Sequence, residues 1–320
     1  MKKYIGSVLT VLVVITLSVL GFVFNPIQLT DLQKQIFIVL AIICGSSALY
    51  CFVVGELSRN NSQMDKIWSI LPLAYTWVIA GMGGFTPRIT LIAILVTLWG
   101  IRLTSNFARK GAYSLKFWSG EEDYRWKVLR KNKYLSNRFA WAMFDLFFIS
   151  IYQNALVLAI CLPALMCVEM NTPLNWVDYL ATGLVAFFIL YETIADEQQM
   201  AFYTTRNNLL KEGKPLAELP SPFNLGFNTN GLWKYSRHPN YLAEQAIWLC
   251  LYLFVIGSGN VAYSFFSWTL VGPLFLIFLF LGSSAFGESV SNSKYPQYKF
   301  YLAQVSKYVP WRKYNPEKNK

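Results

Sequence analysis

Residues 35–54 read QIFIVLAIICGSSALYCFVV, a run without a charged side chain. An α-helix rises about 1.5 Å per residue, so about 20 apolar residues are enough to cross the hydrocarbon core of a bilayer. Seven further apolar runs lie at 4–24, 67–84, 89–108, 141–167, 176–195, 241–257 and 262–282. The sequence therefore predicts an all-α fold, a polytopic bundle of eight membrane-spanning helices.

The composition of the chain agrees with a membrane protein. Of its 320 residues, 55% are hydrophobic and 14% are charged, whereas about a quarter of the residues of a soluble domain are charged. Aromatic residues make up 17%, and Trp and Tyr collect where a bilayer meets water. These values argue against a soluble globular enzyme, a disordered chain and a fibrous protein.

The net charge of +11 follows the predicted orientation of the helices in the membrane. Twenty-six of the 28 Lys and Arg residues lie in the two terminal segments and in alternate loops, and only Lys34 and Arg88 lie in the opposite loops. Basic residues mark the cytosolic side, so we expect both termini in the cytosol. The charge then needs no nucleic-acid partner. We expect the protein in the cytoplasmic membrane of a bacterium or the endoplasmic reticulum membrane of a eukaryote.

We expect a single membrane domain over residues 1–320, with N-terminal helices at 1–60, a main region at 61–310 and a basic tail at 311–320. The apolar run after Lys2 and Lys3 is too long for a typical signal peptide and has no small-x-small cleavage site, so it is interpreted as the first span. Two long connections, 111–138 and 207–239, lie on the predicted cytosolic side, where such loops commonly carry function.

Several kinds of site are excluded by the residues present. The chain has one histidine, so a site built from several histidines is impossible, and we expect no metal. The sequence contains no P-loop and no G-x-G-x-x-G after a strand. The five cysteines lie in or at the ends of apolar spans without a C-x-x-C pair, which is typical of small buried side chains.

The only histidine, His238, lies in the segment GLWKYSRHPNY at 231–241. Pro239 and Asn240 are typical helix-start residues, and Asn240 can act as an N-cap. The free amide groups of a helix N-terminus beside Arg237 and His238 suit a phosphate or a carboxylate. A membrane anchor in which Arg237 snorkels to the interface explains the segment equally well.

Acidic residues at two helix ends add to this signal. Glu244 lies one turn inside the seventh span, where an ionisable group is costly and marks a functional candidate. In the sixth span, five polar residues are spaced by four, three, four and three, which places them on one helix face. They are Glu192, Asp196, Gln199, Tyr203 and Arg206. A solvated face explains the outer half of this set better than its inner half.

A third group of residues follows the last span. Glu288 comes directly after a stretch of small residues, and Tyr295 and Tyr298 lie shortly beyond it. Small residues allow helices to approach closely, which is structural by itself. The carboxylate of Glu288 in this setting suits an amine or a hydroxyl of a ligand.

Together these motifs resemble the DUF1295 branch of the steroid 5α-reductase superfamily, over about residues 60–310. The motifs are Glu192-x3-Asp196-x2-Gln199, GLWKYSRHPNYLAE at 231–244, GSSAFGE at 282–288, YPQY at 295–298, Asp65-x2-Trp68, Trp99-x2-Arg102-Leu103 and GEEDYRW at 120–126. The superfamily also includes sterol reductases and isoprenylcysteine carboxyl methyltransferases, which share the Arg-His-Pro pattern.

The resemblance implies an NADPH site that opens to the cytosol. Asn240, Glu244 and Asp196 correspond to residues of the cofactor region in the steroid reductases. The full set of expected cofactor-binding residues is Glu192, Asp196, Gln199, Tyr203, Arg206, Trp233, Tyr235, Arg237, His238, Asn240, Tyr241, Glu244, Glu288, Tyr295 and Tyr298.

The catalytic residues depart from the family pattern. The steroid reductases polarise the substrate carbonyl with a glutamate on an early span and a tyrosine on a later one. Here Asp65 is the nearest acidic counterpart, and Trp99 falls where the tyrosine is expected. We expect Asp65 to protonate or orient the substrate, framed by Trp68 and Arg102. Alternatively, Asp65 is the N-cap of its own helix.

The leading hypothesis is a reductase that transfers hydride from NADPH to an activated C=C bond of a steroid-like or isoprenoid lipid. The alternative is a methyltransferase that uses S-adenosylmethionine on a lipid or isoprenylcysteine, with Glu288 binding the amine of that cofactor. The third hypothesis is a non-enzymatic transporter or sterol-binding protein. Transporter sites lie near the bilayer midplane, whereas the polar residues here gather at the predicted cytosolic helix ends.

Overall fold

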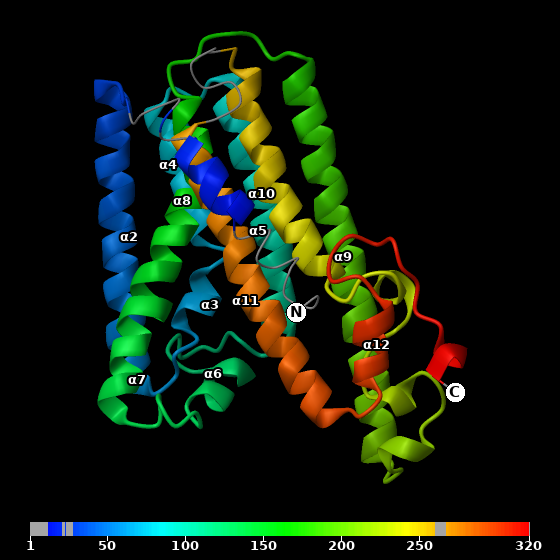
Figure 1. Cartoon of the computed structure of the whole chain (residues 1–320). Helices are drawn as coiled ribbons and strands as arrows, with labels where there is room; N and C mark the ends of the chain where they lie inside the picture. Colours follow the sequence, from blue (N-terminus) through cyan, green and yellow to red (C-terminus); the bar gives the residue numbers. More distant parts are fainter. Residues whose placement is uncertain (1–11, 21–22, 24–27, 260–266, 320) are drawn as a thin grey trace. The chain divides into compact units, whose positions relative to one another are not determined.

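The computed structural model describes residues 12–20, 23, 28–259 and 267–319. These residues are mostly helical and contain no strand, apart from an isolated bridge between Ser236 and Ser306 (Figure 1). The chain divides into two compact units, Met1–Gly183 with Leu249–Leu276 and Leu184–Trp248 with Ile277–Lys320. Helices α9, α10 and α11 each contribute to both units.

Six helical runs among the described residues are long and apolar enough to cross a membrane, which fits a multi-pass membrane protein. They are α2 (Asp31–Ser58), α5 (Pro87–Arg109), the run Arg138–Met166, α9 (Trp176–Lys211), α10 (Pro239–Gly257) and the run Trp268–Lys294, which comprises η6 (Trp268–Leu270) and α11 (Val271–Lys294). Of the predicted first span, residues 12–20 are helical and most of the rest lies outside the described residues.

The predicted third span is shorter than expected. It is replaced by α3 (Gln63–Ile67) and the apolar α4 (Leu71–Met82), with a turn at 68–70 between them. Helix α4 packs on α5, and a Cβ atom added at Gly100 of α5 would lie 2.1 Å from Leu73 Cδ1 and 2.7 Å from the Ser69 carbonyl oxygen. Glycine at this position therefore lets the two helices approach closely.

The run Arg138–Met166 is a single span with a π-helical middle. It consists of α7 (Arg138–Phe144), the π-helix η1 (Asp145–Tyr152) and α8 (Gln153–Met166). Asp145, at the start of η1, is buried. A Cβ atom added at Gly55 of α2 would lie 3.3 Å from Oδ2 of Asp145, so α2 passes close to the Asp145 carboxylate. Short π-helical segments are frequent at functional sites.

A buried ion pair holds the first unit together at the predicted outer side. Arg88, at the start of α5, donates from Nε and Nη2 to the Oδ1 and Oδ2 atoms of Asp178, at 2.8 and 2.9 Å. Its other donors bond to the carbonyl and hydroxyl of Thr172 and to the carbonyls of Pro173 and Gly257. A guanidinium has five N–H donors, and these partners satisfy a charge that is costly to bury alone.

The second unit combines the ends of three long helices with shorter elements. These are η2 (Leu216–Glu218), η3 (Phe223–Leu225), η4 (Gly231–Lys234), α12 (Tyr298–Gln304) and η7 (Pro316–Asn319). Its core is largely aromatic and contains Phe227, Tyr295, Tyr298, Tyr301, Val305 and Tyr314. Gly226 has a φ of 81°, and an added Cβ atom would lie 2.2 Å from the ring of Tyr295, so this turn requires glycine.

Candidate functional site

Helix α9 carries five of the predicted cofactor-binding residues on one uninterrupted helix. Glu192 and Asp196, at the inner end of the set, are buried, whereas Gln199, Tyr203 and Arg206 are half-buried. This change in burial along the helix agrees with a face that leaves the hydrocarbon. Buried carboxylates require hydrogen-bond partners or opposite charges. The groups around Glu192 and Asp196 therefore determine whether this face can bind a ligand.

The first turns of α10 face the buried carboxylates of α9. Asn240 Nδ2 donates to Asp196 Oδ1 at 3.2 Å, and Asn240 Oδ1 accepts from the backbone amide of Tyr241 at 3.0 Å. One turn further along, Glu244 is buried and accepts from Trp248 Nε1 at 3.2 Å. The two helices therefore form a buried polar patch, which we call the α9–α10 patch, defined by Glu192, Asp196, Gln199, Asn240 and Glu244.

The predicted capping role of Asn240 is wrong. Helix α10 begins at Pro239, so the N-cap position falls on His238, whose carbonyl accepts from the amide of Leu242 at 3.1 Å. Proline at the first helical position agrees with the prediction, because its missing N–H has no partner to lose there. Asn240 lies inside the first turn, and its side chain joins α10 to α9 instead.

The segment before α10 lies along α9. The buried Trp233 donates from Nε1 to the carbonyl of Ala195 at 3.0 Å, and the amide of Leu232 donates to Gln198 Oε1 at 2.8 Å. Tyr235, in contrast, is exposed. Trp233 therefore has a structural role against α9, and only Tyr235 of these two predicted residues is freely accessible.

Arg237 is bound to groups of the protein itself. Its Nε donates to Glu288 Oε1 at 2.8 Å, and its Nη1 donates to the carbonyls of Leu302 and Val305, each at 2.8 Å. His238 Nε2 lies 2.9 Å from the same oxygen of Glu288. The expected site for an anion at Arg237 and His238 thus already contains a carboxylate. This Arg237–Glu288 pair joins the start of α10 to α11 and to the end of α12.

The burial of His238 favours its neutral form. Burial lowers its pKa below the ordinary value, although Glu288 acts in the opposite direction. A neutral imidazole that faces a carboxylate donates its Nε2 proton to it. The imidazole ring also stacks on Tyr241, with ring centres 5.2 Å apart and an angle of 14° between the planes.

The outermost predicted residues pack against one another. Arg206 donates from Nη1 to the carbonyl of Gly226 at 2.6 Å and to the hydroxyl of Tyr295 at 3.1 Å, and its guanidinium lies 4.5 Å from the ring centre of Tyr203. Tyr298 is buried in the aromatic core. These contacts stabilise the second unit and do not by themselves indicate a ligand.

Asp65 lies in the first unit, inside α3. Its Oδ2 accepts from Trp126 Nε1 at 2.9 Å and its Oδ1 accepts from Arg125 Nη2 at 3.4 Å, which ties α3 to α6 (Tyr124–Leu129). Burial raises the pKa of Asp65, although Arg125 opposes that effect. The N-cap of α3 is Ser62, so the alternative in which Asp65 caps its own helix is wrong.

Arg102 and Trp99 lie on α5, also in the first unit. Arg102 is half-buried near the end of that helix, and Trp99 is fully buried. Trp99 therefore contributes to the core at the position where the family pattern places a tyrosine.

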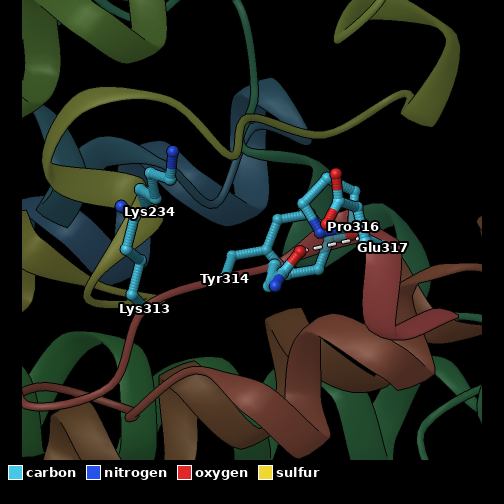
Figure 2. Close-up of a pocket in the computed structure, with 6 residues that line it drawn as sticks. Lys234, Lys313, Tyr314, Pro316 and Glu317 are labelled. Carbon is cyan, nitrogen blue, oxygen red and sulfur yellow. Dashed lines mark hydrogen bonds between the residues drawn. The ribbon is translucent and has the colours of Figure 1, made fainter.

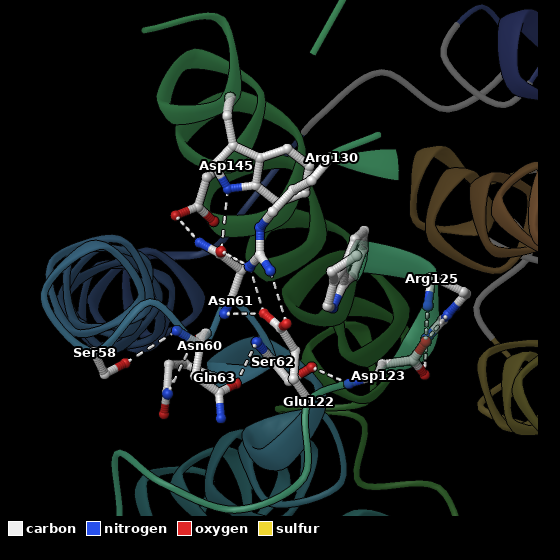
Figure 3. Close-up of polar contacts among 12 residues, drawn as sticks. Ser58, Asn60, Asn61, Ser62, Gln63, Glu122, Asp123, Arg125, Arg130 and Asp145 are labelled. Atoms are coloured by element: carbon white, nitrogen blue, oxygen red, sulfur yellow. Dashed lines mark hydrogen bonds and ion pairs between the residues drawn. The ribbon is translucent and has the colours of Figure 1, made fainter. Parts of the chain in front are cut away.

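A buried polar network near Asp65 was not predicted (Figure 3). Asn61 Nδ2 donates to Asp145 Oδ2 at 2.7 Å, Asn61 Oδ1 accepts from Trp141 Nε1 at 3.1 Å and from Arg130, and Arg130 also binds Glu122. Asp145 is the only acidic residue in the apolar run 141–167. Like Glu244, Asp145 is an ionisable residue about one turn inside an apolar run, so the sequence contains the same signal for both residues.

The α9–α10 patch fits the ribose and carboxamide groups of a dinucleotide. The Oε1 atom of Gln199 is buried and accepts no hydrogen bond from the described residues, and such an orphaned acceptor is costly unless a donor reaches it. Ribose hydroxyls and a carboxamide NH2 group are donors of this kind, and carboxylates commonly accept from ribose hydroxyls. The phosphates of the dinucleotide find no positively charged partner in this patch, because the patch is acidic.

Within the described residues, no group of three His, Cys, Asp or Glu is placed to hold a metal ion.

Comparisons with known proteins agree with the motifs. The family described as "Protein of unknown function (DUF1295)" matches residues 51–305. The "Uncharacterized protein C594.04c" of Schizosaccharomyces pombe is 35% identical over 279 residues, which cover 82% of this chain and 78% of that protein. No solved structure matches the chain. On the extent of both sequence matches, the chain belongs to the DUF1295 family.

Proposed function

We propose that the protein is an NADPH-dependent reductase that acts on an activated C=C bond of a steroid-like or isoprenoid lipid. The observation that carries the proposal is the α9–α10 patch, where Asp196 contacts Asn240 at 3.2 Å and Gln199 Oε1 has no donor among the described residues. A buried patch of acceptors at the end of a membrane helix can bind the sugar of a cofactor while its chemistry is kept from water.

Each residue of the patch has a distinct task in this proposal. Asp196 and Glu244 accept hydrogen bonds from ribose hydroxyls, and Gln199 Oε1 accepts from the carboxamide. Asn240 is a positioning residue, because its amide fixes the carboxylate of Asp196. NADPH supplies the hydride when it is bound. The lipid substrate enters from the bilayer.

The proton of the reaction is assigned to Asp65. A proton donor must keep its proton near neutral pH, and burial raises the pKa of Asp65. The hydrogen bonds from Trp126 and Arg125 fix the orientation of the carboxyl group. Arg102 is proposed to assist Asp65 by stabilising negative charge on the substrate oxygen.

The methyltransferase alternative keeps its Arg-His-Pro pattern but loses part of the role that it gave to Glu288. That hypothesis assigned the carboxylate of Glu288 to the amine of S-adenosylmethionine. Glu288 Oε1 is instead bonded by Arg237 at 2.8 Å and approached by His238 at 2.9 Å. One oxygen of this carboxylate is thus already used inside the protein, so Glu288 favours the methyltransferase less than its sequence position suggested.

Thermal denaturation of the detergent-solubilised protein tests the proposal. A ligand that binds only the folded state raises the melting temperature as its concentration exceeds the Kd, so NADPH should raise it and S-adenosylmethionine should not. Glu244→Gln and Asn240→Ala should weaken this effect. Glu197→Gln is the matched control, because Glu197 is exposed on α9 beside Asp196. Protection by S-adenosylmethionine alone would replace the reductase by the methyltransferase.

A further inference from the structure

A pocket of about 430 Å³ lies in the second unit, apart from the α9–α10 patch residues. It is lined by Lys234, Lys313, Tyr314, Asn315, Pro316 and Glu317. In Figure 2, the two lysines lie along one side of the view, and Pro316 and Glu317 lie along the other. The predicted function gives this pocket no role.

Backbone contacts fix the walls of the pocket. The amide of Tyr314 donates to the carbonyl of Lys234 at 2.8 Å, and the buried ring of Tyr314 packs edge-on against Tyr301, with ring centres 5.5 Å apart. The amide of Asn315 donates to Gln304 Oε1 at 2.8 Å. Because these contacts form within the protein alone, the backbone of the pocket is preorganised, and a ligand has to order only the lysine side chains.

The pocket offers the cationic donors that the Arg237 region lacks. Among the described residues, the ammonium groups of Lys234 and Lys313 have no acidic partner within ion-pair distance, whereas Arg237 is committed to Glu288 and two carbonyls. Each ammonium group has three N–H donors. Two lysines and one carboxylate, Glu317, leave the lining with an excess of positive charge, which suits a phosphate monoester.

We propose that this pocket binds the 2′-phosphate of NADPH and so selects NADPH over NADH. The inference rests on the proposed function. Lys234 lies six residues before Asn240 of the α9–α10 patch, and six residues of chain span at most about 22 Å. The pocket is therefore close along the chain to the candidate cofactor residues. The 2′-phosphate is carried by the adenosine end of the dinucleotide, far from the nicotinamide.

The test compares the binding of NADPH and NADH to four variants of the full chain. Lys234→Gln and Lys313→Gln each remove a charge-assisted contact, so each should raise the Kd of NADPH by about tenfold or more and leave that of NADH unchanged. Glu317→Gln removes the only carboxylate of the pocket and should lower the Kd of NADPH. Lys299→Gln, at an exposed position of α12 outside the pocket, should change neither.

Three results would overturn the inference. The first is an equal loss of NADPH and NADH affinity in the lysine variants, and the second is an equal effect of Lys299→Gln. The third uses nanodiscs that carry a phosphomonoester lipid. If the wild type binds this lipid and Lys234→Gln does not, while Lys234→Gln still binds NADPH, the pocket binds a lipid headgroup instead. If the wild type binds neither dinucleotide but binds adenosine 2′,5′-bisphosphate through the lysines, the pocket stands and the proposed reductase fails.

Discussion

Asp65 is the residue on which the proposed proton transfer depends. Its carboxyl group accepts hydrogen bonds from Trp126 and Arg125. Asp65→Asn keeps an oxygen that can accept one of these bonds but removes the acidic proton. We therefore expect turnover to fall by about 10²-fold or more while NADPH binding is retained, as measured by the oxidation of NADPH once a substrate is found.

Asp123→Asn is the control for that variant. Asp123 contacts the same Arg125 at 2.9 Å and accepts from its backbone amide at the start of α6, a role that asparagine fills equally well. Turnover should persist in Asp123→Asn, although the loss of the Asp123 charge removes one of the effects that raise the pKa of Asp65. Full turnover in Asp65→Asn would leave Asp65 with the task of joining α3 to α6 and move the acid to another group.

His238 provides a pH test, because it is the only histidine of the chain. Burial lowers its pKa in the folded protein, so the unfolded chain binds more protons below the ordinary value of 6.5. The contribution to stability is complete above that pH and is lost as the pH falls below it. His238→Gln keeps a donor for Glu288 but cannot titrate.

The melting temperature should therefore fall more steeply in the wild type than in His238→Gln as the pH is lowered from about 7.5 to about 5.5. Carboxylates that do not contact His238 contribute equally to both proteins and cancel in the comparison, and Glu288, which contacts His238, keeps a hydrogen-bond donor in His238→Gln. Parallel curves would mean that His238 titrates alike in the folded and unfolded states.

At the scale of the elements, the contact between α4 and α5 depends on Gly100. Its Cβ atom would lie 2.1 Å from Leu73 Cδ1 and 2.7 Å from a backbone oxygen, so Gly100→Ala should destabilise the protein by about 1–3 kcal/mol. Gly45→Ala in α2 is the matched control, because nothing lies within 4 Å of its added Cβ atom. Alanine has the higher helix propensity, so that variant should be neutral or more stable by up to about 1 kcal/mol. Equal effects on the melting temperature would contradict this packing.

The long helices were predictable because crossing a bilayer requires a long apolar run, and such runs are visible without any partner. The break between α3 and α4 was not, because the apolar pattern continues through residues 68–70. In the candidate site, the shared face of α9 followed from spacing alone. Arg237 and Glu288 are 51 residues apart in the sequence. The sequence around an arginine does not show whether it binds a phosphate of a ligand or pairs with a distant carboxylate of the protein.

At the scale of the whole molecule, the distribution of basic residues predicts eight spans with both termini in the cytosol. Alkaline phosphatase fused to the C-terminus should be inactive in a bacterial host, and green fluorescent protein fused at the same position should fluoresce. Active phosphatase would indicate an odd number of crossings. It would also place the pocket with Lys234 and Lys313 on the side of the membrane that lacks NADPH.

The shell around Arg88 has a consequence for the order of assembly. Asp178 lies 90 residues after Arg88 in the sequence, and Gly257, whose carbonyl accepts the final hydrogen bond, lies 169 residues after it. On the predicted topology, Arg88 therefore reaches the outer side of the bilayer before the segments that supply its partners have been made. Until the end of α10 has been made, Arg88 lacks part of its protein shell and must be solvated by water and lipid headgroups at the interface. Chains truncated before α10 should thus be substrates for membrane quality control, although every helix up to that point is already complete.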